Sequence, residues 1–217
     1  ATVCTSAVTI EDNVAPVAVC QDLTVQLDVN GTASITAGDV DNGSSDACGI
    51  ASLSIDNGTF TCTEVGSNTV TLTVTDNNGN ATVCTSAVTI EDNVAPVAVC
   101  QDLTVQLDVN GTASITAGDV DNGSSDACGI ASLSIDNGTF TCLEVGSNTV
   151  TLTVTDNNGN ATVCTSAVTI EDNVAPVAVC QDLTVQLDVN GTASITAGDV
   201  DNGSSDACGI ASLSIDN

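Results

Sequence analysis

The sequence predicts an all-β protein made of tandem antiparallel β-sandwich domains, one for each 80-residue repeat. Residues 81–160 copy residues 1–80 at every position but one, where Leu143 replaces Thr63, and residues 161–217 continue the same pattern. Self-similarity at a fixed period indicates an array of like domains. Within a repeat, short segments of alternating apolar and polar residues are separated by turn signals, which is typical of a small β-sandwich.

Four segments of one repeat alternate with the period of two that places apolar side chains on one face of a strand. Val, Ile and Thr dominate these segments, and all three residue types favour strands. No segment shows the 3.6-residue period of a helix. The expected strands are residues 23–29, 50–55, 68–75 and 81–90.

Asn-Gly pairs occur at four positions in the repeat. Both residues tolerate a positive φ, so an Asn-Gly pair between alternating segments is the strongest short-range signal for a β-hairpin. The pair that follows residues 50–55 therefore predicts a tight hairpin at that point. The four pairs are Asn30-Gly31, Asn42-Gly43, Asn57-Gly58 and Asn78-Gly79.

The single proline of each repeat marks the linker between domains. It ends the sequence Glu-Asp-Asn-Val-Ala-Pro, which follows an alternating segment. Proline cannot donate a hydrogen bond to a central strand, and it keeps the preceding residue extended. We therefore place boundaries at Asp12, Asp92 and Asp172. The predicted parts are 1–12, the last strand of a preceding repeat; 13–92 and 93–172, two complete repeats; and 173–217, a truncated repeat.

Each complete repeat contains four cysteines, which predict two disulfides and an oxidising compartment. A sandwich of this size with almost no aromatic residues buries little apolar surface, so crosslinks are needed to stabilise it. Four cysteines allow three pairings. The first and last strands of such a sandwich are commonly neighbours, which favours Cys20–Cys84 and leaves Cys48–Cys62 by elimination.

The second pairing conflicts with the expected hairpin. A tight turn at Asn57-Gly58 would set Cys62 opposite Leu53, so either the turn is irregular or the pairing is wrong. Zinc is the alternative, but spacings of 28, 14 and 22 residues contain no Cys-x-x-Cys pair. The equivalent disulfides of the next repeat are Cys100–Cys164 and Cys128–Cys142.

The composition excludes several classes of function. The chain has 28 Asp and Glu residues and no Lys, Arg or His. Without basic side chains it cannot neutralise phosphates, which excludes nucleic acid and anionic membrane surfaces as direct partners. The usual general bases and activated nucleophiles are also missing, so we expect no enzymatic activity. The apolar runs are too short to span a membrane.

The acidic residues suggest sites for Ca²⁺, a hard cation that takes several carboxylate and carbonyl oxygens at once. The linker carboxylates are placed to meet loop residues of an adjoining domain, and one loop carries three carboxylates within eight residues. The alternative is a solvated, self-repelling surface, with the turn residues acting only as caps. The candidate ligands are Glu11, Asp12, Asn13, Glu91, Asp92 and Asn93 in the linkers; Asp39, Asp41, Asp46, Asp119, Asp121 and Asp126 in the loops; and Asp76 and Asp156 in the turns.

Motifs through the whole repeat point to one family. They are Ala15 to Val25, Ser45 to Gly49, Phe60, Val65 with Gly66, and Thr75 to Asn80 leading to Cys84. Together they resemble the hyalin-repeat family of immunoglobulin-like extracellular modules, although that family commonly has Cys-Pro where this chain has Cys20-Gln21. The resemblance implies tandem arrays at the cell surface, associated with adhesion and without enzymatic activity. The repeat sequence is similar to those of long surface adhesins of gliding Bacteroidetes, which implies export to the outside of a Gram-negative cell.

We expect an extracellular stalk or filament that supports adhesion or a matrix and is stiffened by calcium and disulfides. Its partners would be neighbouring repeats of the same chain and, in a filament, other copies of it. The alternative is a module that binds glycans or proteins through its loops, which the scarcity of aromatic residues disfavours. Glycans attached to the chain are a further expectation from four Asn-x-Ser/Thr sequences per repeat, although three of these are also Asn-Gly turns.

Overall fold

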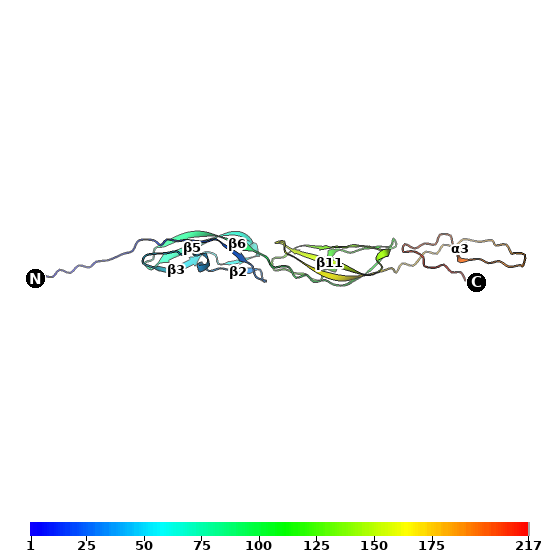
Figure 1. Ribbon diagram of the computed structural model, residues 1–217, viewed down its shortest axis with the longest axis horizontal. Helices are drawn as coiled ribbons and strands as arrows, with labels where there is room; N and C mark the ends of the chain where they lie inside the picture. The colour runs from blue at the N-terminus through cyan, green and yellow to red at the C-terminus, as the bar shows by residue number, and fades with distance from the viewer. Residues whose placement is uncertain (217) are drawn as a thin grey trace. The chain divides into compact units, whose positions relative to one another are not determined.

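A computed structural model describes residues 1–216 and contains two compact units. Unit 1 comprises residues 1–96 together with Asp126–Ile130 and Asp156–Asn160, and unit 2 comprises the rest of the chain. Each complete repeat forms one larger and one smaller β-sheet, with only single turns of helix between strands (Figure 1). This confirms the all-β fold of tandem immunoglobulin-like sandwiches.

The second complete repeat reproduces the elements of the first. Among the described residues, no helix has both the length and the apolar character needed to cross a membrane. The elements of the first repeat are β1 (Leu23–Gln26), β2 (Thr32–Ser34), α1 (Ala37–Val40), β3 (Ile50–Ile55), β4 (Thr59–Thr61), the 3-10 turn η1 (Cys62–Glu64), β5 (Gly66–Asp76) and β6 (Ala81–Glu91). Those that follow are β7 (Leu103–Gln106), β8 (Thr112–Ser114), α2 (Ala117–Val120), β9 (Ile130–Ile135), β10 (Thr139–Thr141), η2 (Cys142–Glu144), β11 (Gly146–Asp156), β12 (Ala161–Glu171) and α3 (Ala197–Val200).

The larger sheet has the strand order β1-β6-β5-β3, and β7-β12-β11-β9 in the second repeat. Its centre is a long antiparallel hairpin of β5 and β6, in which Thr75 lies opposite Ala81 (Figure 1). The turn of this hairpin is the Asn78-Gly79 pair, and Gly79 has a φ of 92°. The turn predicted there is confirmed.

One strand departs from the antiparallel pattern. β1 pairs in parallel with β6, with Leu23 opposite Val88. A parallel pair needs a connection of a dozen or more residues. The rest of the repeat lies between these two strands in the sequence, so the requirement is met.

The hairpin predicted at Asn57-Gly58 is wrong. β3 pairs with β5 in the larger sheet, whereas β4 pairs with β2 in the smaller one. The chain therefore passes from one sheet to the other here and does not fold back. A Cβ on Gly58 would lie 2.9 Å from the Ile35 carbonyl oxygen, so this glycine permits a close backbone approach.

The core lies between the two sheets and follows the period of two. Val70, Leu72 and Val74 of β5 are fully buried, while the threonines that alternate with them are partly or fully exposed. Phe60 from β4 is only 1% exposed and fills the core from the smaller sheet. Burial of alternate side chains between two sheets is the arrangement that the sequence pattern predicted.

The disulfides confirm one predicted pairing and correct the other. Cys20–Cys84 and Cys100–Cys164 form within their repeats, with Cα–Cα distances of 5.8 and 5.9 Å. The predicted pairs Cys48–Cys62 and Cys128–Cys142 are wrong. Cys62 instead pairs with Cys128, and Cys142 with Cys208, each across 66 residues of sequence. Four disulfides indicate an extracellular or secreted protein.

The course of the chain explains the correction. Cys48 precedes β3 and lies beside Asp12 of the linker before the repeat, whereas Cys62 follows β4 and lies beside Gly31. A disulfide requires Cα atoms within about 7 Å. The segment between the two cysteines leaves the larger sheet for the smaller one without turning back, so its ends do not meet.

Residues 1–12, all of which the structure describes, are almost entirely exposed and form no strand. Their sequence matches that of β6, which pairs with β5 and β1. Among the described residues, no strand pairs with this segment.

Candidate metal site

Each linker aspartate lies beside an aspartate of the loop that precedes β3 or its equivalent. Asp12 lies beside Asp46, and Asp92 lies beside Asp126, with one ligand atom of each residue within 4.8 Å of the other. Both pairs belong to unit 1. The sequence placed the linker and the loop residues in separate clusters, and the structure brings one member of each together.

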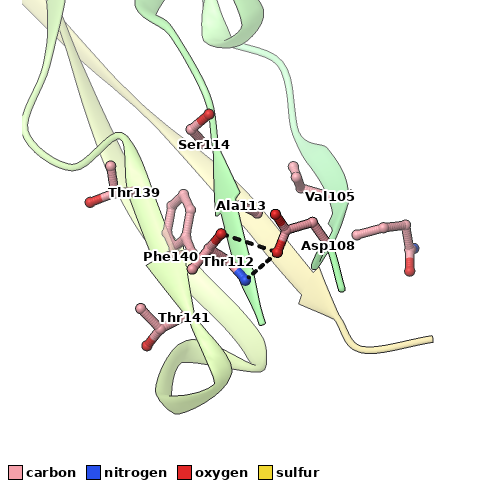
Figure 2. A pocket seen from close by; sticks show the side chains of 9 residues that line it. Val105, Asp108, Thr112, Ala113, Ser114, Thr139, Phe140 and Thr141 are labelled. Carbon is pink, nitrogen blue, oxygen red and sulfur yellow. Dashed lines mark hydrogen bonds between the residues drawn. The ribbon is translucent and has the colours of Figure 1, made fainter. Parts of the chain in front are cut away.

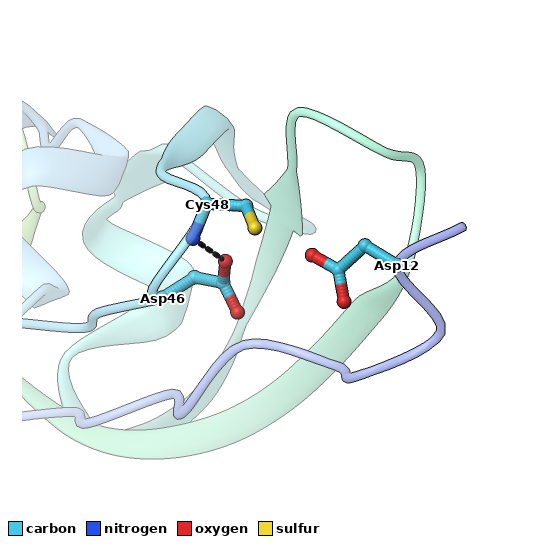
Figure 3. Close-up of side chains that lie close together, drawn as sticks. All are labelled: Asp12, Asp46 and Cys48. Atoms are coloured by element: carbon cyan, nitrogen blue, oxygen red, sulfur yellow. Dashed lines mark hydrogen bonds between the residues drawn. The ribbon is translucent and has the colours of Figure 1, made fainter. Parts of the chain in front are cut away.

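Figure 3 shows the first of these pairs with its neighbouring thiol. The carboxylates of Asp12 and Asp46 and the Sγ of Cys48 point toward one another (Figure 3). One oxygen of each carboxylate is held by a turn, because Asp12 accepts from the Val14 amide at 3.0 Å and Asp46 from the Cys48 amide at 2.7 Å. These bonds fix the carboxylates beside a hollow of about 490 Å³.

The second pair contains an unpaired buried oxygen. Asp92 is 6% exposed, and its Oδ1 accepts from the Val94 amide at 3.0 Å. Its Oδ2 is buried and is the one such side-chain atom of the described residues without a hydrogen-bond partner. A buried carboxylate oxygen without a partner lowers stability. The chain has no Lys, Arg or His side chain that could supply the missing interaction.

The second pair offers only oxygen ligands. Cys128 forms a disulfide with Cys62, so it offers no thiolate to a metal. Only carboxylate and carbonyl oxygens remain, which suits Ca²⁺ rather than zinc.

Cys48 is a free, exposed thiol. A hydrogen bond to Asp12 and the charge of that carboxylate raise the pKa of the thiol. Cys48 occupies the position in its repeat that Cys128 occupies in the next, and Cys128 pairs with a cysteine 66 residues earlier in the sequence.

An asparagine that the sequence did not single out fixes the linker. The side-chain amide of Asn160 donates to the carbonyl oxygens of Asp92 (3.0 Å) and Val94 (3.3 Å) and to Oδ2 of Asp156 (2.8 Å). All four residues belong to unit 1. The turn after β11 is therefore bonded to the linker segment, and Asn80 makes the same bonds to Asp12 and Val14.

The turn carboxylates are occupied by these and other hydrogen bonds. Asp76 accepts from the amides of Asn78 and Asn80 and from the Asn80 side chain, and Asp156 accepts the equivalent bonds. Burial tends to raise the pKa of Asp76, but the hydrogen bonds from Asn80 and the turn outweigh it, so the pKa lies below its ordinary value. The structure thus uses both residues to shape the turn.

The three loop carboxylates predicted as a cluster are also held separately. Asp39 caps α1, accepting from the amide and the hydroxyl of Thr36 at 2.7 Å each. Asp41 accepts from the amides of Gly43 and Ser44. These bonds lower the pKa of both aspartates, led by the side chain of Thr36 and that of Ser44 respectively. Asp119 and Asp121 repeat the arrangement, which leaves Asp46 and Asp126 to face the linkers.

The remaining linker residues lie outside these pairs. Glu91 accepts from the side-chain amide of Gln26 at 2.6 Å, and Asn93 donates to the other end of that amide. They connect β1 to the end of β6. Glu11 and Asn13 are exposed. The structure adds a third pair in unit 2, Asp172 with Asp206, which the repeat itself would have revealed.

A shallow hollow of about 520 Å³ recurs in each complete repeat between the smaller sheet and the turn before it. Figure 2 shows Asp108 at its rim, accepting from the amide (2.9 Å) and the hydroxyl (3.1 Å) of Thr112. The Thr112 amide is the leading cause that lowers the pKa of Asp108. The carboxylate is therefore part of the turn, and Phe140 beside it belongs to the core.

Several solved structures of low sequence identity are similar to the chain. No profile of a known protein family matches it, and no curated protein matches it. Solved structures with similar folds include human mucin-like protocadherin EC1-2, at 12% identity and a TM-score of 0.34, covering 70% of this chain and 96% of that one. The fibronectin(III)-like modules of Clostridium thermocellum CbhA have 15% identity and a TM-score of 0.28, covering 72% of this chain and 92% of theirs.

An endo-fucoidan hydrolase from glycoside hydrolase family 107 is similar over 77% of this chain, with 16% identity and a TM-score of 0.28. This chain spans 30% of the length of that enzyme. At such TM-scores, none of these similarities carries an argument about function.

Proposed function

We propose that the chain is a structural segment of an extracellular stalk or filament of the hyalin-repeat type, which supports cell-surface adhesion or a matrix. The observation that carries this proposal is the disulfide that joins one repeat to the next, Cys62–Cys128. A domain that acted alone through its loops would gain nothing from a covalent bond to its neighbour. A chain of repeats gains continuity from it.

Calcium at Asp92 and Asp126 is part of the proposal. Ca²⁺ takes six to eight oxygen ligands, and two carboxylates supply at most four, so backbone carbonyls and water would complete the shell. The buried Oδ2 of Asp92, without a hydrogen-bond partner, is the feature that a cation would satisfy. With few charged ligands, we expect a dissociation constant of about 10⁻⁴–10⁻³ M, as in extracellular modules.

Thermal unfolding with chelator and with millimolar calcium tests the metal site. We expect calcium to raise the melting temperature, because a ligand of the folded state stabilises it by mass action, and sodium at equal ionic strength to have no such effect. In Asp92→Asn, the amide oxygen still accepts from Val94, so the fold is kept while the calcium effect at this pair is lost. Asp182→Asn removes the same charge from an exposed position and should leave the calcium effect intact. Equal melting temperatures with chelator and with calcium would mean that the acidic residues form a solvated surface and bind no calcium.

Electron microscopy of the native material and a glycan array test the structural role. The proposal expects continuous filaments or stalks that contain this chain, and no glycan retained above the level of the reduced, unfolded protein. Selective retention of one glycan by the folded protein, with no filament, would favour the alternative of an adhesive binding module.

A further inference from the structure

The disulfides between repeats create a short covalent route through the chain. The bond Cys62–Cys128 bypasses 66 residues, and Cys142–Cys208 bypasses the next 66. Only the 14-residue step from Cys128 to Cys142 lies between these two bonds. That step contains β9 and β10, which run from the larger sheet into the smaller one. We call this route line A.

The disulfides within repeats create a second route. Cys20–Cys84 and Cys100–Cys164 each bypass 64 residues. They are connected by the 16-residue step from Cys84 to Cys100, which contains most of β6 and the linker. We call this route line B. Its connecting step shares no residue with that of line A, and the two routes are joined by residues 62–84 and 142–164.

We propose that lines A and B are the tension-bearing elements of the array. They limit the length to which each repeat can be stretched, even when its sandwich is unfolded. This inference deepens the structural role proposed above and rests on it. All four cysteines of the second complete repeat belong to the two lines. The segments that join the lines contain β5 and β11, whereas residues 101–127 lie off all of these routes and carry no tension.

The lengths involved show the size of the effect. An extended chain spans about 3.4 Å per residue, so the 14-residue step of line A reaches ~48 Å. The disulfide adds a Cα–Cα distance of 5.2 Å. A whole repeat of 80 residues without disulfides would reach ~270 Å. The extended length of an oxidised repeat is therefore more than ~200 Å shorter than that of a reduced one.

When one disulfide is lost, the remaining ones keep the covalent path short, and this gives the proposal a distinctive test. With all disulfides present, the shortest covalent path from end to end contains about 68 residues, because it crosses Cys20–Cys84, runs back from Cys84 to Cys62 and continues along line A. Loss of Cys62–Cys128 alone lengthens that path by about two residues, and loss of Cys20–Cys84 alone by about 20, because other bonds replace the lost one. Loss of both lengthens the path to about 133 residues, an increase of ~220 Å.

Single-molecule stretching of the full chain, held by tags at its two ends, tests this. We expect a final contour length of ~230 Å for the oxidised chain and ~740 Å after reduction. The double variant Cys62→Ser/Cys128→Ser should reach ~240 Å, Cys20→Ser/Cys84→Ser ~300 Å, and the quadruple variant ~450 Å. Lengthening by ~200 Å in either double variant would overturn the proposal, as would an oxidised chain that extends as far as the reduced one.

A second measurement does not depend on whether the variants fold. A single backbone cut anywhere between Cys20 and Cys208 is bridged by at least one disulfide. Limited elastase cleavage of the wild-type chain in denaturant should therefore leave one covalent species without reductant, and fragments only after reduction. Separation without reductant after a cut in this region would contradict the two lines. Glycan binding without filaments would contradict the structural role instead, so the two failures are distinguishable.

Discussion

The two disulfides of a repeat close loops of nearly equal length but stabilise different parts of the molecule. Cys20–Cys84 spans 64 residues and Cys62–Cys128 spans 66. By chain entropy alone, each would contribute about 4 kcal/mol. The sheet already fixes the position of Cys84 on β6. Cys62 instead follows β4 of one repeat, and Cys128 precedes β9 of the next. Similar spacing therefore does not mean a similar role.

The largest effect is expected from removing the disulfide within the sandwich. Cys20→Ser/Cys84→Ser should lower the free energy of unfolding of the first repeat by about 4 kcal/mol, because the folded sandwich keeps its order while the unfolded chain gains freedom. Urea denaturation with the disulfide-intact chain as reference measures this. A loss below about 1 kcal/mol would mean that the bond is not formed, or that the unfolded chain is already constrained.

Gly31 provides the next test, because it lies against the disulfide between repeats. Its φ is 71°, and a Cβ there would be 2.6 Å from the Cys62 Sγ and 3.2 Å from the Cβ of Ala127. Gly31→Ala should cost about 1–2 kcal/mol for the left-handed backbone, and it should also hinder formation of the disulfide, which leaves Cys62 and Cys128 as free thiols that can be alkylated.

Gly191→Ala is the matched control for this substitution. Gly191 has the same turn and a φ of 75°, but a Cβ there would meet nothing within 4 Å. We expect it to show the backbone strain with no change in the number of reactive thiols. An equal rise in reactive thiols in both variants would mean that Gly31 acts only through its backbone.

Removal of the bond between repeats should have a smaller effect on stability. Without Cys62–Cys128, the folded state also gains freedom, which offsets part of the entropy gained by the unfolded chain. Cys62→Ser/Cys128→Ser should therefore cost no more than about 2 kcal/mol, and ¹⁵N relaxation should show increased motion in residues 126–130. A cost equal to that of the first pair, with no new motion, would remove the distinction between the two bonds.

The smallest effect is expected from acid. The pKa of Asp28 lies below its ordinary value of 3.8, chiefly because the amides of Thr32 and Asn30 donate to the carboxylate. A lowered pKa in the folded state gives stability that is present above about pH 4 and lost as the pH falls through the folded value. Asp28→Asn should thus be less stable than the wild type at pH 7, and the difference should shrink as the pH falls below about 4. A difference that stays constant with pH would contradict this role for the charge.

Identical sequences in different contexts show which features the sequence could predict. Residues 103–106 form β7, which pairs with β12, whereas the identical residues 183–186 form no strand. The short-range features persist in both copies: α3 repeats α2, and the bridge of Val177 to Ser205 repeats that of Val97 to Ser125. Local patterns therefore predict turns and alternation, but a strand forms only where its partner is present.

The sequence predicted the residue types of the candidate site, but it predicted only in part which of these residues lie together. Asp12 and Asp46 were both named from the sequence, and the pairing of linker with loop follows from the folded course of the chain. The disulfide between repeats was missed because spacing says nothing about which loop lies next to Cys62. The conflict between a tight hairpin at Asn57-Gly58 and the pair Cys48–Cys62 was the signal that could have found it.

The central claim is that Cys62 is bonded to the next repeat, and one count of free thiols tests it. In the wild-type chain, both pairing schemes leave three free cysteines, which here are Cys4, Cys48 and Cys180. In Cys48→Ser the schemes differ, because a bond within the repeat would lose its partner and release Cys62. Alkylation in denaturant without reductant, followed by intact mass measurement, should find two modified cysteines in this variant. Four modified cysteines would contradict the covalent connection between repeats.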